Sequence, residues 1–326
     1  MAARAEFPDK LEVLDLRYFQ SRDLESLLEE EIQIWARDLR WDYHPSADMV
    51  RRYVDMRALA GLALLRAGRP VGYAYYVPED HKALIGNLFV SSPFRTIEAQ
   101  HLLLEQVVET ARQAPGIRRI EAQLVMLESA EAASLYPPEE LSMFERNFML
   151  LEGLQSLQWA PASISRASEI SFQTWSEQYM ESAALLIARS YHQHVDSRIN
   201  DQYRSVGGAR RFLHNITQYP VCGAFHPAAA VVAFDLALGD LCGISLASLV
   251  QARVGHITQL CVSPPRRGSG VGSELLWRTL KVFRRLGGEA VSLTVSEANA
   301  GAVRLYERIG FRTIRRFHAY VWEGWR

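Results

Sequence analysis

The sequence is poor in cysteine, and its cysteines form no metal-binding or disulfide pattern. Cys222, Cys242 and Cys261 are an odd number of residues without a CxxC pair, so neither a disulfide framework nor a zinc site is indicated. A metal interpretation of the segment from His192 to Asp196 is also weak, because residues two apart point to different sides of a helix or strand. We therefore expect no metal in this protein.

The sequence also lacks an excess of one charge and lacks a long apolar run. The formal net charge is −1 over 326 residues, which gives no electrostatic reason to expect nucleic acid or an anionic membrane as a partner. No apolar run reaches membrane-spanning length, and residues 1–15 lack the apolar core of a signal peptide. We expect a soluble cytoplasmic protein, either a monomer or a homodimer.

What the sequence does contain is an internal repeat. The segment IGNLFVSSPFRTIEAQHLLLEQV, which starts at Ile85, aligns without a gap with ITQLCVSPPRRGSGVGSELLWRT, which starts at Ile257. The alternative is that two strand–helix junctions merely share apolar spacing, but the matched serine, proline and arginine positions are not packing requirements. We expect two tandem domains, residues 1–158 and 159–326.

Each half predicts the same order of elements: a strand, helical segments, three strands, a long helix, a strand, a short helix and closing strands. In the second half the three strands are expected over residues 228–235, 241–250 and 255–262. Asn299 is the expected N-cap of the short helix, and Gly310 is its expected C-terminal stop. The fold class is therefore α/β with a mixed (α+β) sheet, formed twice.

Three glycines lie between the last of these strands and the long helix, at Gly268, Gly270 and Gly272. A glycine turn at a helix N-terminus lets an anion approach backbone N–H groups closely. The nucleotide-binding P-loop is excluded because the turn has no lysine, and the dinucleotide fingerprint is excluded because Ser273 stands where a glycine is required. The turn nevertheless predicts a phosphate site of another kind.

The spacing Arg267-x-x-Gly270-x-Gly272 resembles the signature of the GCN5-related N-acetyltransferases, the GNAT superfamily. A second part of the chain is similar to a further pattern of that family, at Asn299, Ala302, Tyr306, Gly310 and Phe311. The resemblance covers nearly the whole second half. It implies two tandem GNAT-like acyl-CoA N-acyltransferase domains.

The resemblance also implies acetyl-CoA as cosubstrate and direct transfer of its acetyl group to a primary amine. The implied cofactor-binding residues are Leu260, Cys261, Val262, Arg267, Gly268, Ser269, Gly270, Val271, Gly272, Ser273 and Asn299. Tyr306 is the implied catalytic acid, which protonates the leaving thiolate. The segment of residues 189–205 either lines the acceptor pocket or is a solvated surface.

The general base is less defined, because His256 stands where several family members have a glutamate. An imidazole titrates near pH 6.5 and can accept a proton, so His256 is a candidate catalytic base. The alternative is a structural hydrogen bond at the start of the strand. Strand alternation predicts His256 on the same side as Leu260 and Val262, unless a strand bulge changes the count.

In the first half the three glycines are replaced by Thr96, Glu98 and Gln100. A carboxylate at Glu98 repels a pyrophosphate, so this half resembles a GNAT domain that has lost CoA binding, a layout similar to that of mycothiol synthase. The expected function is an N-acetyltransferase acting on a small-molecule or peptide amine. The alternative is a noncatalytic acyl-CoA binding or sensor protein.

Overall fold

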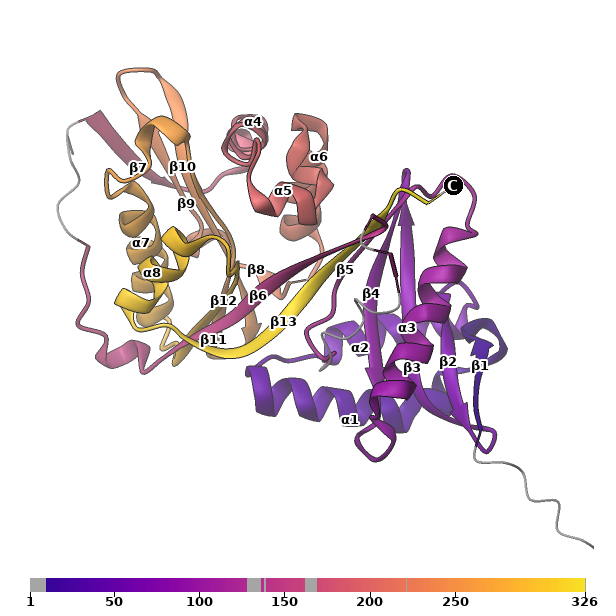
Figure 1. Ribbon diagram of the computed structural model, residues 1–326. Helices are drawn as coiled ribbons and strands as arrows, with labels where there is room; N and C mark the ends of the chain where they lie inside the picture. Colours follow the sequence, from indigo (N-terminus) through magenta and orange to yellow (C-terminus); the bar gives the residue numbers. More distant parts are fainter. Residues whose placement is uncertain (1–9, 128–135, 138, 162–168, 221, 326) are drawn as a thin grey trace, which may run out of the picture. The chain divides into compact units, whose positions relative to one another are not determined.

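The computed structural model describes residues 10–127, 136–137, 139–161, 169–220 and 222–325. The chain forms two compact units (Figure 1). Unit 1 consists of Met1–Leu39, Tyr43–Glu145 and Phe317–Arg326, and unit 2 consists of Arg40–Asp42 and Arg146–Arg316. Each unit contains helices packed on mixed strands, which confirms the predicted fold class.

In unit 1 the strands are ordered β1-β2-β3-β4-β5-β13, and all neighbours are antiparallel except the parallel pair β4/β5. Helix α3 packs its apolar side on β2, β3 and β4, whereas α1 contacts β3 and β4. The elements are β1 (Leu11–Asp15), α1 (Ser21–Leu39), α2 (His44–Asp55), β2 (Ala60–Arg66), β3 (Arg69–Glu79), β4 (Lys82–Val90), α3 (Ile97–Arg112), β5 (Arg119–Gln123) and β13 (Arg312–Glu323).

In unit 2 the order is β6-β12-β11-β10-β9-β7, with the single parallel pair β11/β12 among these neighbours. The short strand β8 pairs with β10. The elements are β6 (Leu141–Glu152), β7 (Ile170–Thr174), α4 (Met180–Ser190), α5 (Val195–Ile199), α6 (Val206–Gln218), β8 (Ala224–Phe225), β9 (Val231–Asp235), β10 (Asp240–Gln251), β11 (Val254–Val262), α7 (Val271–Arg285), β12 (Ala290–Ser296) and α8 (Ala300–Ile309).

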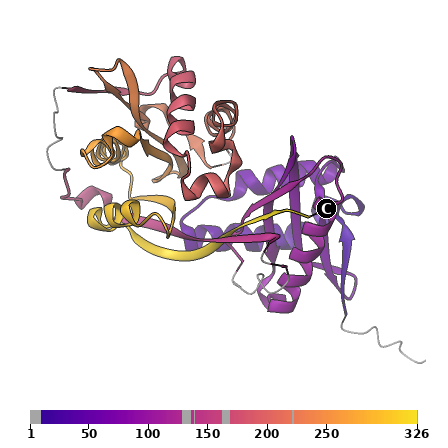
Figure 2. The ribbon, with the colours of Figure 1, turned by 45° about the horizontal axis from the view of Figure 1, so that its top comes forward.

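Two apolar cores lie on the two faces of the unit 2 strands. Helices α7 and α8 cover one face and α4 and α6 cover the other, as Figures 1 and 2 show. The buried residues of α7 include Leu276, Leu280 and Phe283, the stripe that a helical period produces. The helix and strand order predicted for the second half is therefore confirmed.

The compact units are interleaved rather than contiguous halves of the sequence. Residues 146–152 of β6 pair with β12 of unit 2, and residues 319–323 of β13 pair with β5 of unit 1. Without these partners, β5 and β12 would each expose an edge of main-chain N–H and C=O groups. The exchanged strands pair with those groups. The repeat boundary between residues 158 and 159 stays a prediction, because the repeat and the compact unit are different divisions.

The two repeats share a bulge in their third central strand. In unit 1, Asn87 pairs with Tyr75 but Ile85 pairs with Tyr76, so Gly86 is the extra residue. In unit 2, Gln259 pairs with Leu246 but Ile257 pairs with Ala247, so Thr258 is the extra residue. Gly86 and Thr258 occupy matched positions of the sequence alignment. The repeat thus extends to a local irregularity of the backbone.

Candidate active site

The glycine turn joins β11 to α7 through two residues in the left-handed region. Gly268 has φ 75° and Gly270 has φ 92°, values that other residues adopt at a cost. Gly270 is the N-cap of α7, and no side chain accepts a hydrogen bond at this helix end. No described residue accepts from the first-turn N–H groups of α7. These groups, on residues 271–273, can therefore bind an anion.

The matching turn of unit 1 is closed by its own side chains. The Thr96 hydroxyl accepts a hydrogen bond from the Ala99 N–H at 3.2 Å and caps α3. The Glu98 carboxylate accepts a hydrogen bond from its own N–H, which lowers the pKa of that carboxyl. The N–H groups that would bind a phosphate are thus already engaged. These contacts are consistent with the loss of CoA binding that the sequence predicts for this half, which stays a prediction.

The two arginines of the turn are held by unit 2 itself. Arg266 forms ion pairs with Asp235 at 2.6 Å and Glu169 at 3.0 Å, which raise the pKa of its guanidinium. Arg267 donates to the carbonyl oxygen of Ser190, the last residue of α4, at 2.5 Å. A cation at a helix C-terminus is favourable because the last carbonyl groups carry partial negative charge. Arg267 therefore connects the glycine turn to the end of α4.

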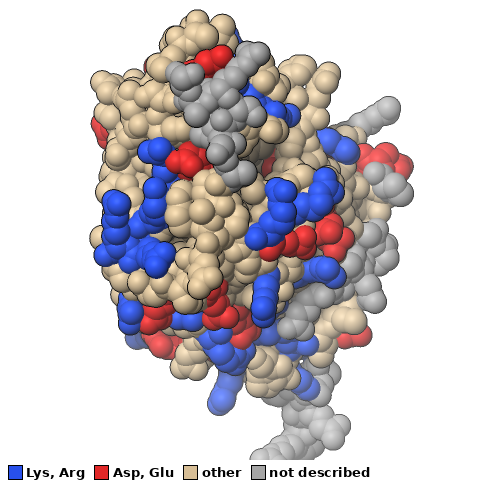
Figure 3. All heavy atoms as spheres, turned by 90° about the vertical axis from the view of Figure 1, so that its left-hand side faces the viewer, with Lys and Arg blue, Asp and Glu red and all other residues tan. Residues whose placement is uncertain are grey.

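Basic side chains also lie on α7, at Arg278, Lys281, Arg284 and Arg285. Figure 3 shows Lys and Arg side chains gathered in patches on the face it presents, with Asp and Glu side chains between them. The small net charge of the chain thus conceals local clusters of positive charge. Such clusters favour the approach of an anionic ligand.

Strands β11 and β12 separate partway along their length. Residues 254–257 of β11 pair with residues 290–293 of β12. Strand β11 stays paired with β10 as far as Val262. Beyond Ile257 the β12 side of β11 is open, so Leu260, Cys261 and Val262 could hydrogen-bond an extended ligand. The Cys261 side chain points into the core beside α4, and burial raises the pKa of its thiol to about 12.

The bulge at Thr258 corrects the predicted orientation of His256. It places His256 on the face of Gln259 and Cys261, whereas Leu260 and Val262 lie on the opposite face with α7. Alternation without a bulge put His256 on the same side as Leu260 and Val262, which is wrong because one extra residue inverts the count.

The surroundings of His256 favour the structural alternative. Its Nδ1 lies 2.9 Å from the Ser292 hydroxyl, and its ring packs against Trp41 and Phe148. Burial lowers the pKa of His256 to about 3, so the imidazole is neutral at working pH and resists protonation.

We expect this histidine to make the free energy of unfolding depend on pH. A histidine in an unfolded chain binds a proton near pH 6.5, but His256 in the folded chain does so only near pH 3. Its contribution to the free energy of unfolding is therefore complete above pH 6.5 and is lost as the pH falls toward 3. The slope is at most about 1.4 kcal/mol per pH unit. In urea unfolding, the parent should lose more stability between pH 7.5 and pH 5 than His256→Gln. Equal losses would contradict the burial argument.

Asn299 and Tyr306 lie at the start and on the buried side of α8. The Asn299 side chain caps the helix by accepting from the Ala302 N–H at 3.3 Å, and Gly310 ends it in the left-handed region. The Tyr306 hydroxyl has no hydrogen bond to a described residue. Burial, and then the negative charge of Asp196, raise the pKa of Tyr306 above its usual value. The phenol therefore keeps its proton and can donate it.

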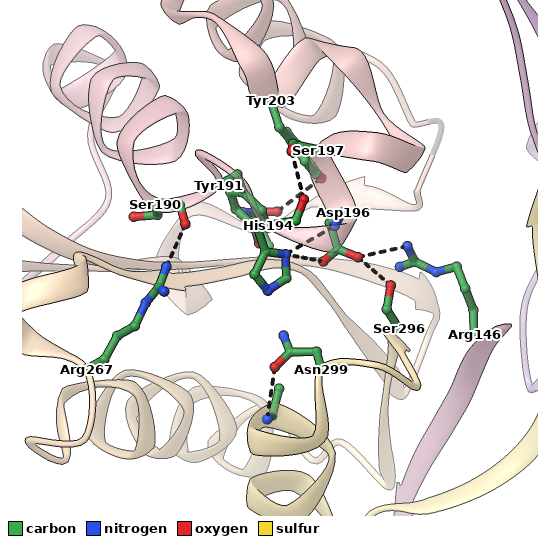
Figure 4. Close-up of polar contacts among 12 residues, drawn as sticks. Arg146, Ser190, Tyr191, His194, Asp196, Ser197, Tyr203, Arg267, Ser296 and Asn299 are labelled. Atoms are coloured by element: carbon green, nitrogen blue, oxygen red, sulfur yellow. Dashed lines mark hydrogen bonds and ion pairs between the residues drawn. The ribbon is translucent and has the colours of Figure 1, made fainter. Parts of the chain in front are cut away.

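Asp196 forms the centre of a polar cluster that sequence reasoning did not assign (Figure 4). Its Oδ1 accepts from the Ser296 hydroxyl and lies 3.4 Å from Arg146 Nη1. Ser296 and Arg146 are opposite each other in the pairing of β12 with β6. His194 caps α5 by accepting the Asp196 N–H at Nδ1. These residues come from distant parts of the sequence, so no local pattern could have joined them.

An amide and two phenols lie beside this cluster. Gln259 donates to the Tyr191 hydroxyl at 2.9 Å and accepts from the Tyr203 hydroxyl at 3.3 Å, and the two rings stack at 4.5 Å. The segment expected to line the acceptor pocket thus brings Tyr191, His194, Asp196 and Tyr203 toward the open part of β11. That arrangement supports the pocket interpretation of residues 189–205.

In unit 1 the matching position is filled by a closed network. Asn87, which aligns with Gln259, donates to Glu31 at 2.8 Å, and the Tyr73 hydroxyl donates to the same carboxylate at 2.5 Å. Burial raises the pKa of Glu31 to about 7. The Glu31 carboxylate accepts hydrogen bonds from its neighbours instead of facing a ligand.

Other site types find no support among the described residues. No group of three or more His, Cys, Asp or Glu side chains there converges as a metal site requires. No helix in this part of the chain is long and apolar enough to cross a bilayer.

Comparison with known proteins agrees with this geometry. The model described as "Acetyltransferase (GNAT) family" matches twice, at residues 24–137 and 197–311. N-alpha-acetyltransferase MAK3 of Arabidopsis thaliana is 32% identical over 130 residues, which are 40% of this chain and 63% of that protein. A mycothiol acetyltransferase of Propionibacterium freudenreichii is 38% identical over 93 residues, 28% of this chain and 30% of the relative. The chain thus spans less than two thirds of either relative.

Solved structures match over nearly the whole chain. A GCN5-related N-acetyltransferase from Sphaerobacter thermophilus has a TM-score of 0.66 at 19% identity and covers 96% of both chains. A tandem GNAT protein from the clavulanic acid biosynthesis pathway has a TM-score of 0.60 at 16% identity, over 96% of this chain and 98% of the other. At such identities the similarity shows the fold alone.

Proposed function

Because the chain belongs to the GNAT acetyltransferase family, we propose that unit 2 is an acetyl-CoA-dependent N-acetyltransferase whose acceptor is a primary amine. The observation that carries the proposal is the uncapped N-terminus of α7 beside the open edge of β11. This pair of features offers N–H groups to a pyrophosphate and a strand edge to an extended arm.

The residues present fit the cosubstrate. The N–H groups of the turn and first helical turn would hold the pyrophosphate, and main-chain groups of Leu260, Cys261 and Val262 would hold the pantetheine arm. The turn residues are Arg267, Gly268, Ser269, Gly270, Val271, Gly272 and Ser273. Arg267 acts by fixing the turn to α4. Asn299 acts by starting α8, which presents Tyr306.

Tyr306 is the residue that we assign as acid. Its ring is buried and its hydroxyl keeps its proton at neutral pH, so it can protonate the thiolate that leaves the thioester. His256, the candidate base from the sequence, is poorly suited to that role. Its Nδ1 lies beside Ser292, and burial disfavours its charged form.

The acceptor is proposed as a small-molecule or peptide amine. The carboxylate of Asp196 near Tyr306 suits a cationic group, and the relatives named N-alpha-acetyltransferase and mycothiol acetyltransferase support an amine acceptor. In the same proposal unit 1 does not bind acetyl-CoA, since Thr96 and Glu98 occupy its helix N-terminus.

Release of CoA thiol tests this function directly. The full chain is incubated with acetyl-CoA and a panel of amines, including short peptides with a free N-terminus, amino sugars and alkyl amines. We expect thiol release that depends on one of these amines. Tight binding of acetyl-CoA without turnover on any amine would favour the noncatalytic acyl-CoA sensor, and no binding in calorimetry would overturn both.

A further inference from the structure

We propose that Asp196 binds the ammonium group of the acceptor and takes its proton, an inference that rests on the proposed function of unit 2. The two oxygens of this carboxylate are used differently. Oδ1 has two neighbours, the Ser296 hydroxyl and the Arg146 guanidinium. Oδ2 receives no hydrogen bond from a described residue, and the Nδ1 atom of His194 lies 3.7 Å from it. One oxygen is therefore held in place and the other is available.

His194 does not neutralise the available oxygen. Its Nδ1 accepts a hydrogen bond from the backbone N–H of Asp196, with 3.2 Å between the two nitrogens. At 3.7 Å the same nitrogen is too far from Oδ2 for a hydrogen bond. The side chain of Asp196 is 16% exposed, so a small cationic group can reach it while most water is excluded.

The position of Asp196 relative to the transfer residues supports this role. Ser296, its hydrogen-bond donor, is the last residue of β12, beyond the point where that strand separates from β11. The charge of Asp196 also acts on the Tyr306 hydroxyl, the assigned acid. Figure 4 shows Asp196 beside Ser296 and Arg146, next to the end of β12.

The step balances as follows in atoms and charge. The ammonium nitrogen gives one proton to Asp196 Oδ2, and its lone pair forms the C–N bond to the acetyl carbonyl carbon. The C–S bond breaks and its electron pair stays on sulfur, which takes the proton of Tyr306. The second proton lost by nitrogen restores Tyr306, and the proton on Asp196 passes to water, so one proton is released per turnover.

A purely structural role is the competing explanation, because Asp196 also ties α5 to β12 and β6. The pH dependence of a charge-neutral variant separates the two. A base is needed only while the acceptor is an ammonium ion, whereas a structural defect persists when the amine is already neutral. The charged and titratable groups that face Asp196 are Arg146 of β6, His194 of its own turn, Tyr191 directly after α4, Tyr203 and Tyr306 of α8.

The experiment compares the full-length parent with Asp196→Asn and Asp196→Glu, with Asp240→Asn, an exposed aspartate at the start of β10, as the matched control. The acceptor is the fastest of the amines in the panel that are largely neutral at pH 9, such as a peptide N-terminus, whose α-amino group titrates at about 7.7–8.0. We expect kcat/KM for the amine to fall about 100-fold at pH 6.5 in Asp196→Asn, with the acetyl-CoA Kd unchanged. The deficit should shrink at least tenfold by pH 9, and Asp196→Glu should restore part of the rate.

Ser296→Ala provides a second variant that keeps the carboxylate but removes its hydrogen-bond donor. It should lower kcat/KM several-fold at pH 6.5 and leave acetyl-CoA binding intact. Two results would overturn the role of Asp196 alone, provided that the parent is active. One is an equal fall in kcat/KM of Asp196→Asn at pH 6.5 and pH 9, and the other is no fall at either pH. A parent that acetylates no amine would instead overturn the proposed function.

Discussion

Gly270→Glu is expected to weaken acetyl-CoA binding at least about a thousandfold and to abolish acetylation. The substitution copies Glu98, the residue at the matched position of unit 1. It forces a side chain onto a backbone with φ 92° and brings a carboxylate to the N–H groups of residues 271–273. Lost charge-assisted hydrogen bonds cost about 1.5–3 kcal/mol, and repulsion between like charges in contact adds several more. Titration calorimetry measures the loss.

The matched control is Gly239→Glu. Gly239 also has a positive φ, 70°, and an added Cβ there meets no neighbour within 4 Å. Gly239 lies in the turn between β9 and β10. A glutamate there imposes the same backbone strain and adds the same charge, but away from the N-terminus of α7. We expect parent affinity in this control. An unchanged Kd in Gly270→Glu would contradict the assignment of the turn.

Tyr306→Phe is expected to lower kcat about 1,000-fold, within the range that a positioned proton donor contributes. Phenylalanine keeps the ring that packs in the core of unit 2 and contacts Phe311, so the fold and the acetyl-CoA Kd should change little. The hydroxyl has no hydrogen bond to a described residue, which limits the cost in stability. Steady-state kinetics with saturating acetyl-CoA measures the effect.

Tyr136→Phe is the control for this variant. Tyr136 lies in unit 1; its buried hydroxyl has no partner among the described residues, and its ring packs against Trp322. We propose that unit 1 takes no part in the transfer, so kcat should stay at the parent value. A Tyr306→Phe enzyme that keeps the parent rate would contradict the assignment of Tyr306 as the acid.

The parts of the site that the sequence predicts are those specified by local chemistry. Glycines at positive φ, Asn299 as a cap and Gly310 as a stop are signals carried by a few adjacent residues, and each has the expected conformation. The repeat was visible for the same reason, since strand, turn and helix follow one another in a gapless alignment. Local signals thus define the part of the site that we propose for the cofactor.

The part of the site that we propose for the acceptor depends on pairing between distant strands, which no local pattern encodes. One extra residue at Thr258 changes the face of His256, and the alternation of apolar residues does not mark a bulge. Arg146 reaches Asp196 because β6, from the first half of the sequence, pairs with β12. The exchange of strands between repeats had no signal in composition or periodicity, so this part of the site required the structure.

The number of acetyl-CoA molecules bound per full-length chain tests the central claim most directly. Unit 2 offers unoccupied N–H groups at its helix N-terminus, whereas Thr96 and Glu98 engage those of unit 1. Titration calorimetry should therefore give one acetyl-CoA per chain, and Glu98→Gly should leave that number at one. Two acetyl-CoA molecules bound per parent chain, or none, would contradict the account.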